Sequence, residues 1–217
     1  MVGMTTEARR GQRWLPALLG LAAFVVSVLA LGLVAVDWTW RNMEMNALVT
    51  AVEASEAAMG RTQDDLRETA GRLGSGSPTD AQKQAVIDAL AAGAARGEFR
   101  IGAAGDVVGQ VEVLPWHREI IDAKEIYIAH NRSWQDYMAD IAADPKVYGT
   151  DQPLIDETFM AADPLMRAAV PDPPLFDLAQ RVDRIFVEGS GPPPADGGAD
   201  GGGEPDGQEV VLPVALR

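Results

Sequence analysis

The chain has 217 residues and no cysteine. This absence excludes a disulfide framework, a zinc site built on thiolates and a lipid attached through cysteine. It leaves the compartment open, because an exported protein need not carry disulfides. Histidine is scarce as well, with His117 and His130 only. At about 100° of rotation per residue they lie roughly 140° apart around one helix, so they cannot share a metal ion there.

Common catalytic motifs are also missing. The sequence has no G-x-S-x-G element, no P-loop, no dinucleotide fingerprint and no calcium loop with its terminal glutamate. Basic side chains are few, 18 against 32 acidic ones, which gives a formal net charge of -14. Such an acidic surface repels nucleic acid. We therefore expect no enzymatic activity, no cofactor, no metal ion and no nucleic-acid partner.

The sequence does contain one long run without charge, from Leu15 to Val36. As a helix it would extend roughly 33 Å, enough to cross a bilayer core of about 30 Å. This predicts a transmembrane helix over residues 14–37. Indole rings, which settle at the lipid headgroups, flank the run on both sides as predicted membrane-interface residues: Trp14, Trp38 and Trp40.

A cleaved signal peptide is the alternative reading of this run. Signal peptides have shorter apolar regions of about 7–15 residues, and Val36 is a poor cleavage residue, although a site after Ala30 stays open. The run therefore favours an uncleaved signal anchor. Positive charge precedes it (Arg9, Arg10 and Arg13), and positive charge stays in the cytoplasm. We expect residues 1–13 in the cytoplasm and the rest of the chain outside, in a bacterial cell envelope.

Small side chains recur along one face of the predicted span. Spacings of three and four residues align a set that would let a second helix approach closely in lipid: Gly20, Ala23, Ser27 and Ala30. A homo-oligomer formed through this face is one interpretation. The other is that small residues are simply frequent in membrane helices and in this chain.

Two long heptad-patterned helices follow. The first, residues 41–73, has large a-type residues (Met45, Val52, Met59, Leu66, Leu73) but small, polar later d-type ones (Ser55, Thr62, Thr69). The second, residues 116–143, repeats large residues every seven positions (Ile120, Tyr127, Trp134, Ile141). We predict that they form a long antiparallel, coiled-coil-like pair. Tyr127 and Trp134 would fill the space beside the small d-type residues.

Glycine and proline interrupt the segments around these two helices. A shorter helix is expected from Ser77 to about Ala95, and the β-branched residues around a Gly/Asp turn predict a small β-hairpin over residues 98–114. After Pro145, short helices are expected over three ranges: 154–162, 165–169 and 175–187. Glycine, proline and acidic residues dominate residues 189–217, which predicts a disordered tail, with Val210 to Leu216 apolar again.

Polar residues within the second seam are the candidate site. Lys124, Tyr127 and Asn131 lie in the seam with Trp134, and polar groups there need partners or a pocket. The functional interpretation is a pocket between helices. The alternative is that Asn131 fixes the register and Lys124 reaches solvent. His130, one residue from the seam, is interpreted as a partly buried hydrogen-bonding residue.

Taken together, these features predict a mainly α protein with four parts: a cytoplasmic N-terminus (1–13), one transmembrane helix (14–37), an extracytoplasmic helical bundle with a small hairpin (38–188) and a disordered tail (189–217). The expected function is non-catalytic binding or scaffolding, with the bilayer and an envelope protein as partners. The alternative is a ligand-binding, sensor-like bundle that signals through a partner membrane protein.

Overall fold

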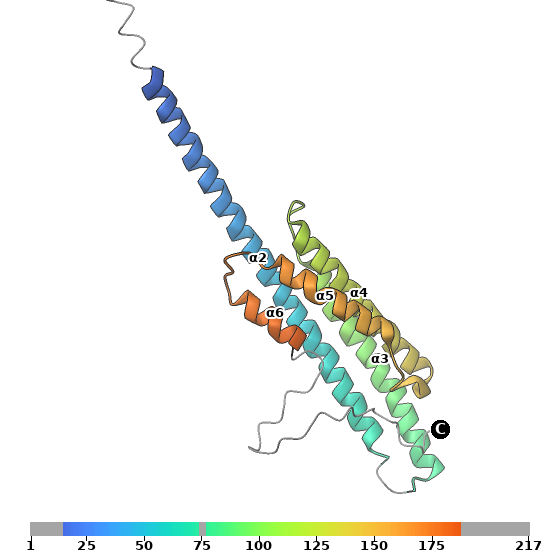
Figure 1. The fold of residues 1–217 in the computed structure, drawn as a ribbon. Helices are drawn as coiled ribbons and strands as arrows, with labels where there is room; N and C mark the ends of the chain where they lie inside the picture. Colours follow the sequence, from blue (N-terminus) through green and yellow to red (C-terminus); the bar gives the residue numbers. More distant parts are fainter. Residues whose placement is uncertain (1–14, 74–76, 188–217) are drawn as a thin grey trace, which may run out of the picture. The chain divides into compact units, whose positions relative to one another are not determined.

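The structure is a computed structural model that describes residues 15–73 and 77–187. The predictions for residues 1–13, for Trp14 and for the tail lie outside these ranges. Within them the regular structure is helical, with one short 3-10 helix, and the elements follow each other along the chain (Figure 1): α2 (Leu15–Gly71), α3 (Asp80–Gln110), α4 (Arg118–Ala143), η1 (Pro145–Val147), α5 (Pro153–Ala169) and α6 (Leu178–Val187).

The chain divides into two units by its internal contacts, Met1–Met43 and Glu44–Arg217. Helix α2 runs without interruption through both, so the predicted span and the heptad segment after it form one continuous helix. In the first unit the large apolar side chains from Leu18 to Val36 are exposed. With a mean hydropathy of 2.7, this part of α2 is a candidate membrane span.

In the second unit, α2 buries the seam that the heptad pattern predicts. The five a-type residues from Met45 to Leu73 are all buried, and so are Ser55 and Thr62. On α4 the four large residues of the second repeat are buried as well: Ile120, Tyr127, Trp134 and Ile141. The prediction of these two apolar faces is confirmed.

The predicted β-hairpin over residues 98–114 is wrong. Helix α3 begins after the N-cap Thr79, whose side chain and that of Gln82 form a capping box, and continues to Gln110. The described residues contain no strand. The glycines read as turn signals instead mark close helix contacts, because a Cβ on Gly97 would overlap the methyl group of Thr62 and one on Gly105 would press on Asn131.

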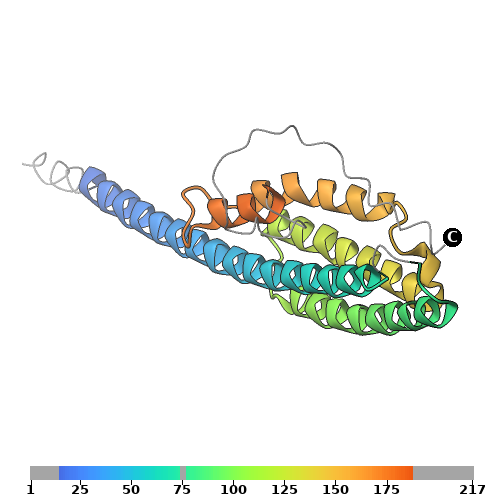
Figure 2. The same cartoon turned by 90° about the horizontal axis from the view of Figure 1, so that it is seen from below.

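The prediction of an antiparallel pair of long helices is also wrong for these two helices. Glu44 contacts His117 and Ser55 contacts Asn131, so residue numbers rise together along α2 and α4, which are parallel. The antiparallel neighbour of both is α3, which returns the chain along their length (Figure 2). The physical reason is the length of α3: a helix of 31 residues covers about 46 Å, so it carries the chain back along the packed part of α2 before α4 begins.

Two shorter helices complete the second unit. Helix α5 is continuous through Pro164, so the predicted break there is wrong. Proline has no N–H to donate to the carbonyl of the preceding turn, but Pro164 is exposed, so that carbonyl can bond to water instead. Helix α6 starts at Leu178 rather than Leu175, after two residues with positive φ, Phe176 and Asp177.

The side chains of α6 dock on α2. Arg181 donates to both carboxylate oxygens of Glu53 (2.9 and 2.6 Å) and to the side chains of Asn46 and Thr50.

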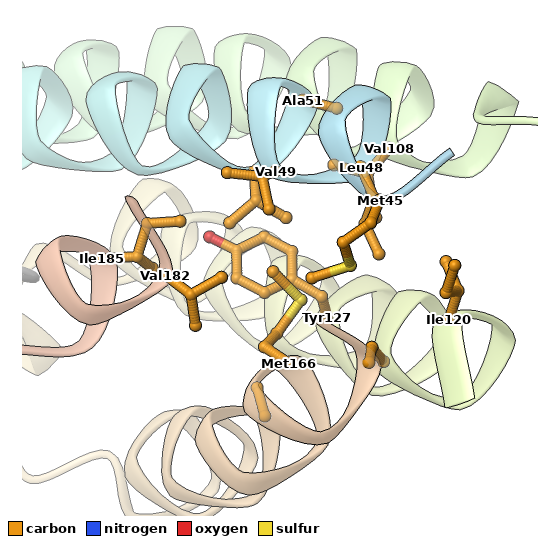
Figure 3. Packing of buried hydrophobic residues seen from close by; sticks show 14 of the residues in the cluster. Met45, Leu48, Val49, Ala51, Val108, Ile120, Tyr127, Met166, Val182 and Ile185 are labelled. Atoms are coloured by element: carbon orange, nitrogen blue, oxygen red, sulfur yellow. The ribbon is translucent and has the colours of Figure 1, made fainter. Parts of the chain in front are cut away.

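The core of the second unit has two clusters. One surrounds Tyr127, whose ring lies among Met45, Val49 and Met166 from α2 and α5 (Figure 3), with Val182 of α6 in the same cluster. The other contains the later a-type residues of α2 with side chains of α3, α4 and α5. Helices α2, α3, α4 and α5 contribute buried side chains to both clusters, and α6 contributes to the first.

Candidate functional site

Buried polar groups concentrate on the face of α4 that contacts α2. Tyr127 is fully buried and its hydroxyl donates to the carboxylate of Glu56. The amide of Asn131 accepts a hydrogen bond from Ser55 Oγ (2.5 Å) and donates to the backbone oxygen of Tyr127 (3.1 Å). Because burial disfavours a charged carboxylate, the pKa of Glu56 is raised, against a smaller opposite effect of the tyrosine bond.

His130 lies one turn along from Tyr127 and is 1 % exposed. Its Nδ1 is 3.0 Å from the hydroxyl oxygen of Thr158 on α5. That hydroxyl lies 2.8 Å from the carbonyl of Leu154 and 3.0 Å from that of Ile155, so its one proton is directed to the backbone. Thr158 Oγ1 must then accept from His130 Nδ1–H, which leaves the Nε2 lone pair of the neutral ring as an acceptor.

Burial keeps this imidazole neutral. It lowers the pKa of His130 from 6.5 to about 4, partly offset by a backbone hydrogen bond at Ile155. The nearest carboxylate oxygen is Glu56 Oε1, 3.9 Å from Nε2, which is too far for a hydrogen bond. Nε2 therefore has no hydrogen-bond partner among the described residues.

Trp134 is four residues further along α4 and shares this feature. Its side chain is buried, and its indole Nε1–H has no hydrogen-bond partner in the described part of the chain. Trp134 and His130 both line a cleft of about 430 Å³ where α2, α4 and α5 meet. Tyr137 and Phe159 add aromatic walls, with ring centroids 6.1 Å from Trp134 and 5.3 Å from His130 respectively.

The four candidate pocket residues lie in three different settings. Tyr127 and Asn131 belong to the buried network with α2, and Trp134 lines the cleft. Lys124 of α4 is half-buried, and its Nζ donates to the carbonyl oxygens of Val111 (2.9 Å) and Gly109 (3.4 Å) at the C-terminal end of α3. This is a helix C-terminal cap, in which a cation satisfies the last free carbonyls.

The residues assigned to the membrane lie in the first unit. Trp40 is about half exposed, and the four small residues of the predicted packing face (Gly20, Ala23, Ser27, Ala30) are exposed. Ser27 Oγ donates to the carbonyl of Ala23 (2.9 Å), so its hydroxyl is satisfied within the helix. This face and the role of the indoles remain predictions.

The second histidine, His117, links the loop between α3 and α4 to helix α2. His117 Nδ1 lies 2.6 Å from Glu44 Oε2, and both side chains are buried. The other oxygen of Glu44 accepts from the backbone N–H of Leu114 (3.1 Å). Both contacts tie a loop to the neighbouring helix, which is a structural role.

The hydroxyl groups on the helices that pack around His130 are engaged in hydrogen bonds of their own. The nearby hydroxyl groups, Ser55 and Thr158, direct their protons to Asn131 and to backbone carbonyls, so neither is presented to the imidazole as a nucleophile. Among the described residues no three His, Asp or Glu side chains lie close enough to hold a metal ion.

Sequence reasoning missed the cleft because its walls come from distant segments. His130 and Trp134 are four residues apart and share a helical face, which is a readable signal. Nothing in the sequence indicates that Phe159 and Thr158 of α5 pack against that face. Comparison with known proteins adds no further assignment: no family model, no curated protein and no solved structure matches the chain.

Proposed function

We propose that the chain is a single-pass cell-envelope protein whose N-terminus lies in the cytoplasm and whose helical bundle lies outside, where it binds another envelope protein without catalysis. The observation that carries the proposal is the continuity of α2 from Leu15 to Gly71. One end of this helix exposes only apolar and small side chains, as a lipid-facing helix does, and the other end forms the core of the bundle.

Exposed apolar side chains on the bundle support a protein partner. Phe99 on α3 is 80 % exposed and Met160 on α5 is 74 % exposed. Each lies on the solvent-facing side of its helix, where contact with a partner would remove the side chain from water.

Site-specific crosslinking in native membranes tests the binding proposal. A photoreactive residue at position 99 or 160 should give a discrete crosslinked species, whereas the same residue at Asp88, an exposed polar position on α3, should not. Two differently tagged copies of the chain would distinguish a homo-oligomer from a different partner. Equal patterns at all three positions, or no crosslink at any of them, would contradict the proposal.

A second candidate, a ligand-binding bundle that signals through a membrane partner, is favoured by the cleft beside His130 and Trp134. Only the short predicted segment 1–13 would lie inside the cell, so the signal would pass to another protein.

A further inference from the structure

The cleft at the junction of α2, α4 and α5 has the size and composition of a small-molecule site. Its volume of about 430 Å³ falls within the range of roughly 300–1,000 Å³ typical of ligand pockets. Gln63 lines it from α2, Tyr137 from α4 and Phe159 from α5. Aromatic walls with a few polar groups are the usual lining of such sites.

Two buried polar atoms belong to residues that line this cleft and have no hydrogen-bond partner in the described chain. One is His130 Nε2, an acceptor, and the other is Trp134 Nε1–H, a donor. A buried polar group without a partner is unfavourable, so most such groups in native proteins are paired. A hydroxyl group has both functions that these atoms lack, since it donates one proton and accepts at its oxygen.

The residues around the mouth determine the charge that the cleft accepts. Asp151 and Asp156 both line it and both are exposed, and neither forms an ion pair with another described residue. No lysine or arginine is among the residues that line the cleft, and His130 is neutral. Two carboxylates without a counter-charge attract a cation and repel an anion.

We propose that this cleft binds a small organic cation: a primary amine on an aromatic or aliphatic ring that carries a hydroxyl group. The hydroxyl group lies between His130 Nε2 and Trp134 Nε1, the ring packs on Tyr137 and Phe159, and the ammonium group faces Asp151 and Asp156. This site goes beyond the proposed partner binding. Ligand binding by the chain in detergent requires neither the membrane orientation nor the protein partner, so failure of one proposal is distinguishable from failure of the other.

Calorimetric titration of the full chain in detergent micelles with three probes of equal ring size tests the proposed chemistry. Tyramine has both the ammonium and the hydroxyl group, phenethylamine lacks the hydroxyl group, and 4-hydroxyphenylacetate replaces the ammonium group with a carboxylate. We expect tyramine to bind and each of the other two to bind at least about tenfold more weakly, since each loses one set of polar contacts.

Three variants locate the binding. Trp134→Phe keeps a ring but removes the N–H donor, and it should weaken tyramine binding about tenfold. Asp156→Asn removes one rim charge at an exposed position, and it should weaken binding several-fold. Asp122→Asn is the matched control, because Asp122 is exposed on α4 but does not line the cleft; it should bind tyramine as the parent chain does.

The proposal is overturned if tyramine does not bind at millimolar concentration, or if the three probes bind equally well. It is also overturned if tyramine binds but neither Trp134→Phe nor Asp156→Asn weakens it relative to Asp122→Asn. Should Trp134→Phe prove unfolded by circular dichroism, the comparison of Asp156→Asn with Asp122→Asn decides alone.

Discussion

Gly97 lies where α3 passes closest to α2, and its replacement by alanine tests the close helix contact directly. A Cβ at this position would overlap Thr62 Cγ2 and approach Met138 Sδ to 3.3 Å. Thr62 cannot simply turn away, because its hydroxyl donates to the carbonyl of Ala58 (2.8 Å) and its side chain is buried. The added methyl group must therefore push the two helices apart.

Two opposing effects set the size of the change. Alanine is better than glycine in a helix interior by about 1 kcal/mol, whereas one methyl group too many in a packed core costs about 1–3 kcal/mol. The difference predicts that Gly97→Ala lowers the free energy of unfolding by up to about 2 kcal/mol. Gly60→Ala is the matched control: a Cβ at Gly60 on α2 meets nothing within 4 Å, so this variant should gain about 1 kcal/mol.

Thermal unfolding of the full chain in detergent, followed by circular dichroism, measures the difference. At about 2–4 °C per kcal/mol, Tm should fall by up to about 8 °C in Gly97→Ala and rise by about 2–4 °C in Gly60→Ala. Thr62→Ser removes the methyl group that the new Cβ would strike, so the double variant should recover most of the loss. An increase in Tm for Gly97→Ala, or no recovery in the double variant, would refute the close contact.

Three further predictions follow from the polar contacts. Ser55→Ala leaves Asn131 Oδ1 without its 2.5 Å donor and should cost about 1–2 kcal/mol in urea unfolding; an unchanged midpoint would mean that the bond is not formed. His130, with a pKa lowered to about 4, stays neutral in the folded chain, whereas the unfolded chain binds a proton below about pH 6.5. The free energy of unfolding is therefore unaffected by this group above pH 6.5 and falls by up to about 3 kcal/mol as the pH drops to 4. His130→Gln should remove this part of the pH dependence, as measured by urea unfolding at several pH values across that range. Arg181→Lys loses the forked contacts that hold α6 on α2 and should speed amide exchange within α6, while Arg184→Lys, at an exposed position of the same helix, should leave exchange unchanged.

The apolar pattern was the most informative part of the sequence. The heptad positions of α2 and α4 are buried from Met45 to Leu73 and from Ile120 to Ile141, because a repeat of three and four residues can only place side chains on one helical face. The hypothesis that Tyr127 and Trp134 fill the space beside the small d-type residues meets a different arrangement at Ser55, which donates to Asn131 of α4 and also interacts with the hydroxyl group of Tyr127. Thr62 is instead covered by Gly97 of α3.

The wrong predictions concern residues whose local sequence favours one structure while their tertiary contacts stabilise another. Gly102 and Gly105 are typical of a turn when read locally, but here they allow α4 to approach α3, with Gln135 and Asn131 against them. Val107 and Val108 have high strand propensity, yet burial of Val108 within the helix outweighs it. The predicted hairpin covers residues that form the second half of α3. The predicted direction of α4 relative to α2 is wrong as well. The cleft could not be predicted, since it depends on where α5 crosses α4.

The central claim, that the bundle lies outside a membrane spanned by the start of α2, is best tested by cysteine labelling. The absence of native cysteine makes each introduced thiol unique. Asp136→Cys places one at an exposed position of α4, and Thr5→Cys places one before the span. In intact cells a membrane-impermeant maleimide should label Cys at 136 but label Cys at 5 only after permeabilisation. Labelling of position 5 alone in intact cells, or recovery of the chain in the soluble fraction, would contradict the account.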